Sequence, residues 1–313
     1  MMPLVASARF APFRARRRAR GVAFVLVMWV IAMLSVLLGS FALIARTESM
    51  QSRHLFDTTT ARYAAEAGIN LAVYGLSKSD PTQKWVADGR PYAIVFDGVE
   101  VEISLTDDSG KIDINAADPV ALKSLFVGAG VEESKAEELA DAIQDWRDPD
   151  DQTGLHGAEQ GDYRAAGLPY SPRNAPFETL SEIQQVFGMD YAIYSKIEPA
   201  ITMFSGRSTP SAAYAPMEAM MAIPGMTPDL ARQLIQERQQ LAPGMLNQGG
   251  SGLLLPDGSP LMADGGGLTY SVKSRAKLPN GAGTVLDATI RMGGMNSAGR
   301  PFVVLRWRDG ENA

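Results

Sequence analysis

The chain contains an apolar run that is hard to place in a soluble fold. From Val22 to Ala45 the sequence carries no charged residue over 24 positions. As a helix at about 1.5 Å per residue, this run spans roughly 36 Å, which is enough to cross a bilayer. In a soluble protein, a helix without a polar face has to be enclosed on every side. The run therefore predicts a membrane-spanning helix over residues 22–45.

The distribution of charge orients this helix and excludes several classes of function. Residues 1–20 contain six arginines and no acid, so the positive-inside rule places the N-terminus in the cytoplasm. The net charge of the whole chain is -6, and removing those six arginines leaves -12 on the rest. This balance argues against general affinity for nucleic acid. Because the chain has no cysteine, it has no disulfide, no Cys-ligated metal and no thiol nucleophile.

The boundary between the basic segment and the apolar run resembles the type IV prepilin leader. It reads Arg20-Gly21-Val22-Ala23-Phe24. The resemblance implies a leader over residues 1–21, cleavage after Gly21 by a prepilin peptidase, and an N-methylated Val22 at the start of a retained helix. Pilin-like subunits usually carry Glu at the fifth mature position, and this chain has Leu26 there. The alternative is an ordinary signal anchor in which Gly21 is only a flexible residue.

Beyond the apolar run the pattern predicts a helix, then strands, then a helical block, then strands again. The helix continues through Thr47–Leu76, and a hairpin follows at 92–96 and 99–105, joined by Asp97-Gly98. Asp118 is a candidate N-cap with Pro119 at the first helical position. Further segments are expected as helices at 131–146, 177–187, 191–200, 217–223 and 227–240, as a loop at 241–267, and as strands at 268–276, 284–292 and 301–307.

This order predicts an α+β protein with a helical domain inserted into a pilin-like antiparallel sheet. The strands on both sides of the helical block need partners, and the sheet needs the N-terminal helix on one face. The expected division is a periplasmic helix with the first strands at 46–110, an inserted α-helical domain at 111–242, and a loop with the completing strands at 243–313.

Several motifs in a fixed order resemble the type II secretion system protein K family. They are RRRARGVAFVLVMWV, GKIDINAADPVAL, ADAIQDWRDPDD, GAEQGDY, NAPFETLSEIQQVFGM and AIPGMTPDLARQLI. The absence of Glu at the fifth mature position, here Leu26, is also a trait of that family. The resemblance implies a non-enzymatic minor pseudopilin that initiates and caps the tip of the pseudopilus, for export of folded proteins across the outer membrane.

The same resemblance implies a location and a set of partners. The chain would be a single-pass protein of the bacterial inner membrane with a periplasmic C-terminal domain. Its partners would be the minor pseudopilins I and J, then protein H and the major pseudopilin G, together with the prepilin peptidase. No nucleic acid is expected among them.

A cluster of acidic residues predicts a cation site. Within eighteen residues the chain has Asp145, Asp148, Asp150, Asp151, Glu159 and Asp162. Such carboxylates repel one another unless a cation neutralises them, and hard oxygen ligands favour calcium. The spacing partly matches an EF-hand loop, but Thr153 occupies the glycine position and Pro149 breaks the usual entry. We rank Asp148, Asp150 and Glu159 above the other three. The family resemblance implies calcium in the helical domain, whereas an exposed acidic loop with capping roles is the alternative.

Two other functions receive less support from the sequence. Residues 186–190 and 223–230 look like helix-hairpin-helix turns, which in DNA-binding proteins hold phosphates, and they suggest a membrane-anchored DNA-uptake protein. However, the basic residues near the second turn, Arg232 and Arg238, are balanced by acids. A signal-anchored hydrolase would need His156 as its base, and no serine lies in a nucleophile-elbow context. We therefore expect no catalytic residue.

Overall fold

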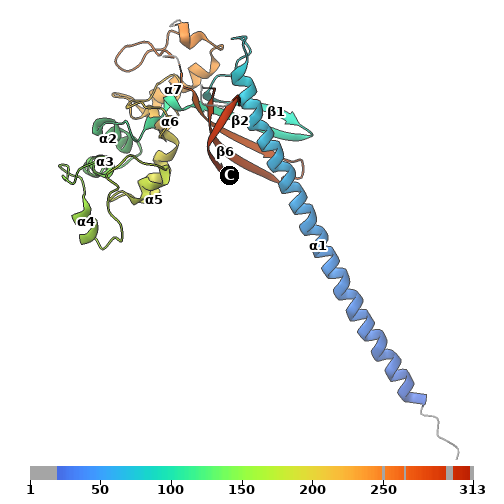
Figure 1. Cartoon of the computed structure of the whole chain (residues 1–313). Coiled ribbons are helices and arrows are strands. Elements are labelled where there is room, and N and C mark those ends of the chain that lie inside the picture. Colours follow the sequence, from blue (N-terminus) through green and yellow to red (C-terminus); the bar gives the residue numbers. More distant parts are fainter. Residues whose placement is uncertain (1–19, 249–250, 264–265, 294–298, 311–313) are drawn as a thin grey trace, which may run out of the picture. The chain divides into compact units, whose positions relative to one another are not determined.

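The computed structural model describes residues 20–248, 251–263, 266–293 and 299–310 (Figure 1). By its internal contacts the chain divides into two compact units, residues 1–56 and 57–313. The first unit contains the apolar part of α1 (Arg20–Ser77), and the second contains everything that folds around a sheet. The two units are described separately below.

In the first unit the chain forms only helix over its described residues. Side chains from Val22 to Phe56 are almost all exposed, and α1 is the only described helix that is long and apolar enough to cross a membrane. The predicted helix over 22–45, with its continuation to Leu76, is confirmed. The helix passes through the predicted cleavage position at Gly21, whereas most of the predicted leader, residues 1–19, lies outside the described residues.

The second unit is built on an antiparallel sheet of five strands. The strands are β1 (Asp88–Phe96), β2 (Val99–Asp107), β5 (Thr269–Lys277), β6 (Gly283–Met292) and β7 (Phe302–Asp309), in the spatial order β1-β2-β5-β6-β7. The predicted hairpin is confirmed. Its two turn residues, Asp97 and Gly98, both have positive φ, at 49° and 77°, as a type I′ turn requires. The three strands expected near the C-terminus are also present.

One face of the sheet packs on the C-terminal part of α1. The helix meets the sheet with small residues, and Ala61, Ala64, Ala65 and Ala72 are all buried. Gly68 lies so close to the sheet that a Cβ there would be 3.0 Å from the Val101 Cγ1 atom and closer still to Ser274. The cost of glycine inside a helix, about 1 kcal/mol, is thus offset by packing that no larger residue allows.

Gly75, about two turns after Gly68 along α1, lets an aromatic side chain lie directly on the helix. A Cβ at Gly75 would overlap the ring of Trp85. The backbone N–H of Trp85 donates to the Gly75 carbonyl oxygen at 3.0 Å. Trp85 also stacks on Tyr92 of β1, with ring centroids 4.1 Å apart and planes within 2°. This stack covers the β1 side of the sheet next to the helix.

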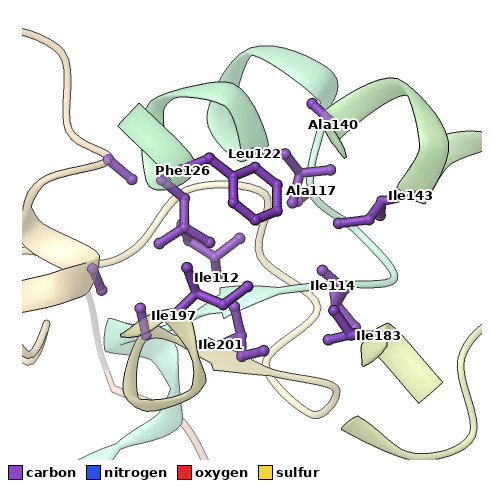
Figure 2. Packing of buried hydrophobic residues seen from close by; sticks show 14 of the residues in the cluster. Ile112, Ile114, Ala117, Leu122, Phe126, Ala140, Ile143, Ile183, Ile197 and Ile201 are labelled. Carbon is purple, nitrogen blue, oxygen red and sulfur yellow. The ribbon is translucent and has the colours of Figure 1, made fainter. Parts of the chain in front are cut away.

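Between β2 and β5 the chain forms a helical domain with its own core. Figure 2 shows part of this core, in which Phe126 and Leu122 of α2 lie above Ile112. The domain also contains a short parallel pair, in which Ile112 of β3 lies opposite Ile201 of β4. Its elements are η1 (Asp108–Gly110), β3 (Ile112–Asp113), α2 (Pro119–Gly128), α3 (Glu133–Arg147), α4 (Gln160–Ala165), η2 (Leu180–Gln185), α5 (Tyr191–Ile197), η3 (Glu198–Ala200), β4 (Ile201–Thr202), α6 (Met217–Met220), α7 (Pro228–Gln240) and η4 (Met245–Gln248).

Local sequence signals account for several helix starts and fail for one segment. The predicted N-cap at Asp118 is confirmed, since its side chain accepts the Ala121 N–H at 2.7 Å. Thr227 caps α7 in the same way, through the Leu230 N–H. The prediction of one α-helix over 177–187 was wrong, because only the 3-10 helix η2 forms there. The predicted helix at 191–200 is present as α5 continued by η3, whereas the one expected at 217–223 is shorter, because α6 ends at Met220.

The helical domain is fastened to the sheet where it leaves and re-enters it. Asp107, at the end of β2, accepts the Ser109 N–H at 2.8 Å and the Gly267 N–H at 2.7 Å. The neighbouring Asp108 accepts the hydroxyls of Thr202 and Ser271, each at 2.7 Å. Both carboxylates are almost fully buried. They join the first and last residues of the insertion through interior hydrogen bonds, which hold its position more strictly than exposed ones would.

We expect Gly75→Ala to destabilise the fold, although alanine is the better helix former. The new methyl group would displace the Trp85 ring, and overpacking of this kind costs about 1–3 kcal/mol. Thermal unfolding in detergent, followed by near-ultraviolet circular dichroism, should show a Tm lower by several degrees. Gly161→Ala is the matched control, because nothing lies near its Cβ position. An unchanged Tm for Gly75→Ala would contradict the packing described here.

Candidate functional site

The acidic residues predicted as a cation site lie on one loop of the helical domain, at the ends of two helices. Asp145 is in the last turn of α3, Asp148 is the C-cap of that helix, and Glu159 is the N-cap of α4. The loop between them, residues 149–158, contains Asp150 and Asp151. The helices α3 and α4 thus bring three of the six predicted residues to the two ends of one loop.

Asp145 is buried and is held by the backbone of the loop. Its two carboxylate oxygens accept the Gly154 N–H at 3.1 and 3.0 Å. A Cβ at Gly157 would overlap the same carboxylate, so the loop closes over Asp145 only because glycine stands at that position. Burial is the main cause that raises the pKa of Asp145, and the nearby Asp148 and Asp141 raise it further.

Glu159 and Asp148 have buried oxygen atoms without hydrogen-bond donors. Glu159 is 5% exposed, and neither of its carboxylate oxygens makes a hydrogen bond of good geometry within the described residues, although the backbone N–H groups of the first turn of α4 lie beside them. The Asp148 Oδ1 atom is also buried and has no hydrogen-bond partner within the described part of the chain. Burial, followed by the charge of Asp145, raises the pKa of Glu159 to about 7. Burial and then Asp150 raise the pKa of Asp148.

The other three predicted residues are exposed and take part in ordinary hydrogen bonds of the loop. Asp150 accepts the Gln152 N–H at 2.9 Å, and Asp151 accepts the Asn174 Nδ2–H at 2.9 Å. Asp162 accepts the Glu159 N–H at 2.9 Å. In the structure Asp145, Asp148 and Glu159 are therefore the desolvated members of the cluster. This grouping differs from the sequence-based ranking, which preferred Asp150 to Asp145.

Sequence reasoning missed one acidic residue of this region, Asp141. It lines an open pocket together with Asp145, Asp148 and Asp150, and its Oδ2 atom accepts the His156 N–H at 3.1 Å. The spacing of 141, 145 and 148 is that of one helix face, so the period of α3 was a signal that could have found it.

The donor chemistry fits a hard cation, although the side chains do not form a closed coordination sphere. In the described part of the chain, no three His, Asp or Glu side chains converge as in an assembled metal centre. A buried carboxylate without donors is nevertheless costly, because it has lost water and gained no partner. A bound cation is the usual means of compensation, and carboxylate oxygens suit calcium. The arrangement can accept a cation.

The two helix-hairpin-helix turns have the expected backbone but not the expected cations. Gly188 and Gly225 have φ of 76° and 75°, so each turn uses a glycine in the left-handed region. Arg238, however, is 1% exposed and donates to the carbonyls of Ala212, Asp88 and Ala215. It is therefore not available to a phosphate, and the structure removes one of the two basic residues that the DNA-binding interpretation used.

Comparison with known protein families agrees with the motif pattern. Residues 103–206 match the model of the family described as type II secretion system protein K. Type II secretion system protein K of Klebsiella pneumoniae is 27% identical over 205 residues, and the match covers 59% of this chain and 62% of that protein. The protein K of Dickeya chrysanthemi is 21% identical over 282 residues, and the match covers 71% of this chain and 78% of that protein.

A solved structure has the same fold. It is the GspK-GspI-GspJ complex from the type 2 secretion system of enterotoxigenic Escherichia coli. One chain of it aligns with a TM-score of 0.59 and 20% identity, covering 85% of this chain and all of the other. The resemblance to protein K that the motifs indicated is confirmed, and so is the predicted α+β architecture.

We expect the raised pKa of Glu159 to make the free energy of unfolding of the metal-free protein depend on pH. Its folded pKa, about 7, lies above the ordinary glutamate value of 4.5, so this carboxyl keeps its proton to a higher pH in the folded state than in the unfolded state. With a metal chelator present, the free energy of unfolding should therefore fall as the pH rises from about 4.5 to 7, by roughly 3 kcal/mol at most.

Urea unfolding at a series of pH values measures this dependence. Glu159→Gln should flatten it, because the variant has no proton to lose there. Glu138→Gln, on an exposed part of α3, is the control and should keep the slope of the parent protein. Identical slopes for the two variants would show that Glu159 is not the group responsible.

Proposed function

We propose that this chain acts as a minor pseudopilin of the type II secretion system, anchored in the inner membrane with its C-terminal domain in the periplasm. The observation that supports this proposal is the arrangement of three parts of the chain: the family-matching region, the sheet and the long helix. A region matching the protein K family is inserted between two strands of a pilin-like sheet, and that sheet packs on the end of a long helix whose N-terminal part is apolar.

In this function the apolar part of α1 is a shared spine. Its side chains from Val22 onward are exposed, so they need either lipid or the helices of neighbouring subunits around them. We infer cleavage after Gly21 by the prepilin peptidase, with Val22 as the methylated terminus. The partners would be the pseudopilins I and J, which the comparison structure contains in its own complex, and then H and the major pseudopilin G.

Two features support a position at the tip of the filament. Leu26 stands where a pilin-like subunit carries the acid that pairs with a neighbour's terminal ammonium, and a buried acid without that partner is costly. The insertion adds a folded domain at a place where a plain sheet needs only a turn. Its bulk would prevent a further subunit from stacking above, so this chain would initiate and cap the pseudopilus through which folded proteins are exported.

Calcium would have a structural role in the helical domain. Asp145, Asp148 and Glu159 are the desolvated carboxylates that would hold it, with Asp150 beside them at the open pocket. Once bound, the cation supplies the positive charge that these oxygens lack. The chain's own part is to fix the loop, through the Gly154 N–H on Asp145 and the Asn174 side chain on Asp151.

Mass spectrometry of the protein from its own membrane, combined with gentle co-purification, tests the function. We expect a mature chain that starts at methyl-Val22 and is recovered with subunits of pseudopilin sequence. Gly21→Leu should abolish processing and recovery together, whereas Gly39→Leu, a glycine with open space around it in the same helix, should leave processing intact. An intact Met1, or a mature end near Ala45, would remove the pilin-like assignment.

A calcium titration of thermal stability tests the cation site separately. Saturating calcium should raise Tm by several degrees, since a ligand at about 100 times its Kd contributes about 2.7 kcal/mol. Asp148→Asn should lose most of this gain, whereas Asp229→Asn, on the exposed face of α7, should keep it. If both variants gain as much as the parent protein, the acidic loop has only a capping role.

A further inference from the structure

A second cavity, which shares no lining residue with the acidic pocket, lies between the sheet and the helical domain. It has a volume of about 230 Å³, and residues of β2, β5, β6 and β7 form one side of it. The other side comes from the helical domain and includes Pro199 of η3 and Phe204. The core of the helical domain and the core between α1 and the sheet are separate clusters, so apolar packing leaves this space unfilled.

Two rows of paired polar residues form the sheet side of this cavity. One row runs through Ser104, Lys273, Asp287 and Arg308. The next row runs through Thr106, Ser271, Thr289 and Arg306. Residues directly opposite each other in neighbouring strands have Cβ atoms about 4.5–5.5 Å apart, so each row presents a continuous line of polar groups. Alternation along the strands gives both rows the same face of the sheet.

Three hydroxyl groups of these rows have no hydrogen-bond partner within the described part of the chain. Ser104 and Thr106 are half-buried, and Thr289 is 7% exposed. The hydroxyl of Ser271, by contrast, donates to Asp108 at 2.7 Å and accepts from Lys111 at 2.5 Å. Each free hydroxyl offers one donor and two acceptor positions, so the floor of the cavity can match a ligand that itself carries hydroxyl groups.

The charged side chains of the lining leave one positive charge unbalanced, since four of them are basic and three are acidic. Lys111 pairs with Asp108 at 3.3 Å. Lys273 is exposed and forms neither a hydrogen bond nor an ion pair among the described residues. Its cross-strand neighbour Asp287 accepts instead from the Arg308 Nε atom, at 3.4 Å. The ammonium group of Lys273 can therefore receive an anion without first losing a partner.

Two arginines of the edge strand β7 share one carboxylate at this cavity. Glu198 accepts from the Arg306 Nη2 atom at 2.8 Å and from the Arg308 Nη1 atom at 2.5 Å. Burial alone would raise the pKa of Glu198, but the hydrogen bonds and charges of these arginines outweigh it and lower that pKa. The arginine side chains are 33% and 44% exposed, and each keeps N–H groups without an acceptor among the described residues. An anion can thus reach them from the solvent.

We propose that this cavity binds a sugar acid of one ring, a ligand with one carboxylate and several hydroxyl groups. The carboxylate lies toward Lys273 and the free N–H groups of the two arginines, where it balances the excess charge. The hydroxyl groups lie toward those of Ser104, Thr106 and Thr289, and the C–H groups of the ring cover Phe204.

Such a ligand touches both the sheet and the helical domain, so binding stabilises the contact between them. Two sources share its chemistry, a free sugar acid and the terminal residue of an acidic polysaccharide. The assignment does not depend on the proposed secretion function.

Calorimetric titration of the full chain with glucuronate tests the site, in micelles of a zwitterionic detergent that has no sugar headgroup. We expect saturable binding of one molecule per chain. Glucose, which lacks the charge, and cyclohexanecarboxylate, which lacks the hydroxyl groups, should each bind at least about tenfold more weakly. Lys273→Ala and Thr289→Val should each weaken glucuronate binding roughly fivefold. Lys277→Ala, a lysine of the same strand outside the lining, is the control and should change nothing.

A second arm identifies the source of the ligand. A disaccharide with glucuronate at its non-reducing end should bind at least as well as glucuronate if the cavity takes a chain end. Much weaker binding of the disaccharide assigns the free acid. Equal affinity for glucuronate and glucose, or no saturable heat with either acidic probe, overturns the proposal. An effect of Lys273→Ala no larger than that of Lys277→Ala also overturns it. Circular dichroism of each variant confirms that the fold is retained.

Discussion

The close approach of one helix to one sheet is the contact on which the second unit depends. The C-terminal turns of α1 present alanine and glycine to the sheet, and larger residues at Gly68 or Gly75 would separate the two. Because a helix is about 10 Å wide and five strands span more than twice that width, α1 alone cannot cover the sheet. The Trp85–Tyr92 stack covers the β1 side.

The helical domain carries one loop at which buried negative charge is not balanced. Glu159 and Asp148 have buried oxygens without hydrogen-bond partners among the described residues. Folded proteins rarely keep such groups, since each lowers stability unless a bound species completes it. We propose that a divalent cation completes this loop.

Sequence patterns predicted the elements whose signals are local. The apolar run, the Asp97-Gly98 turn and the cap at Asp118 each depend on a few neighbouring residues, and the structure has all three. The pairing of β3 with β4 was not predictable, because residues almost ninety positions apart form it. The segment 177–187 had a helical pattern, yet packing in the core limits it to one 3-10 helix.

The acidic cluster was visible in the sequence, but the environment of each carboxylate was not. Charge density identifies this loop as a candidate cation site, which stays a prediction, and sequence cannot say which carboxylates are desolvated. Asp150 and Asp151 are exposed, whereas Asp145 is covered by a loop that closes at Gly157. Arg238 is the opposite case. The DNA-binding interpretation required its side chain on the surface, whereas the structure buries it.

The place at which the helical domain joins the sheet has a consequence for modularity. It leaves from the end of β2 and returns at the start of β5, and these strands are neighbours, with Asp107 directly opposite Tyr270. Without the insertion, the two strands would need only a tight turn to become a plain hairpin. The sheet therefore imposes no limit on the size of what is spliced in at this point. A domain of this kind can be exchanged or trimmed over time while the scaffold beneath it stays the same.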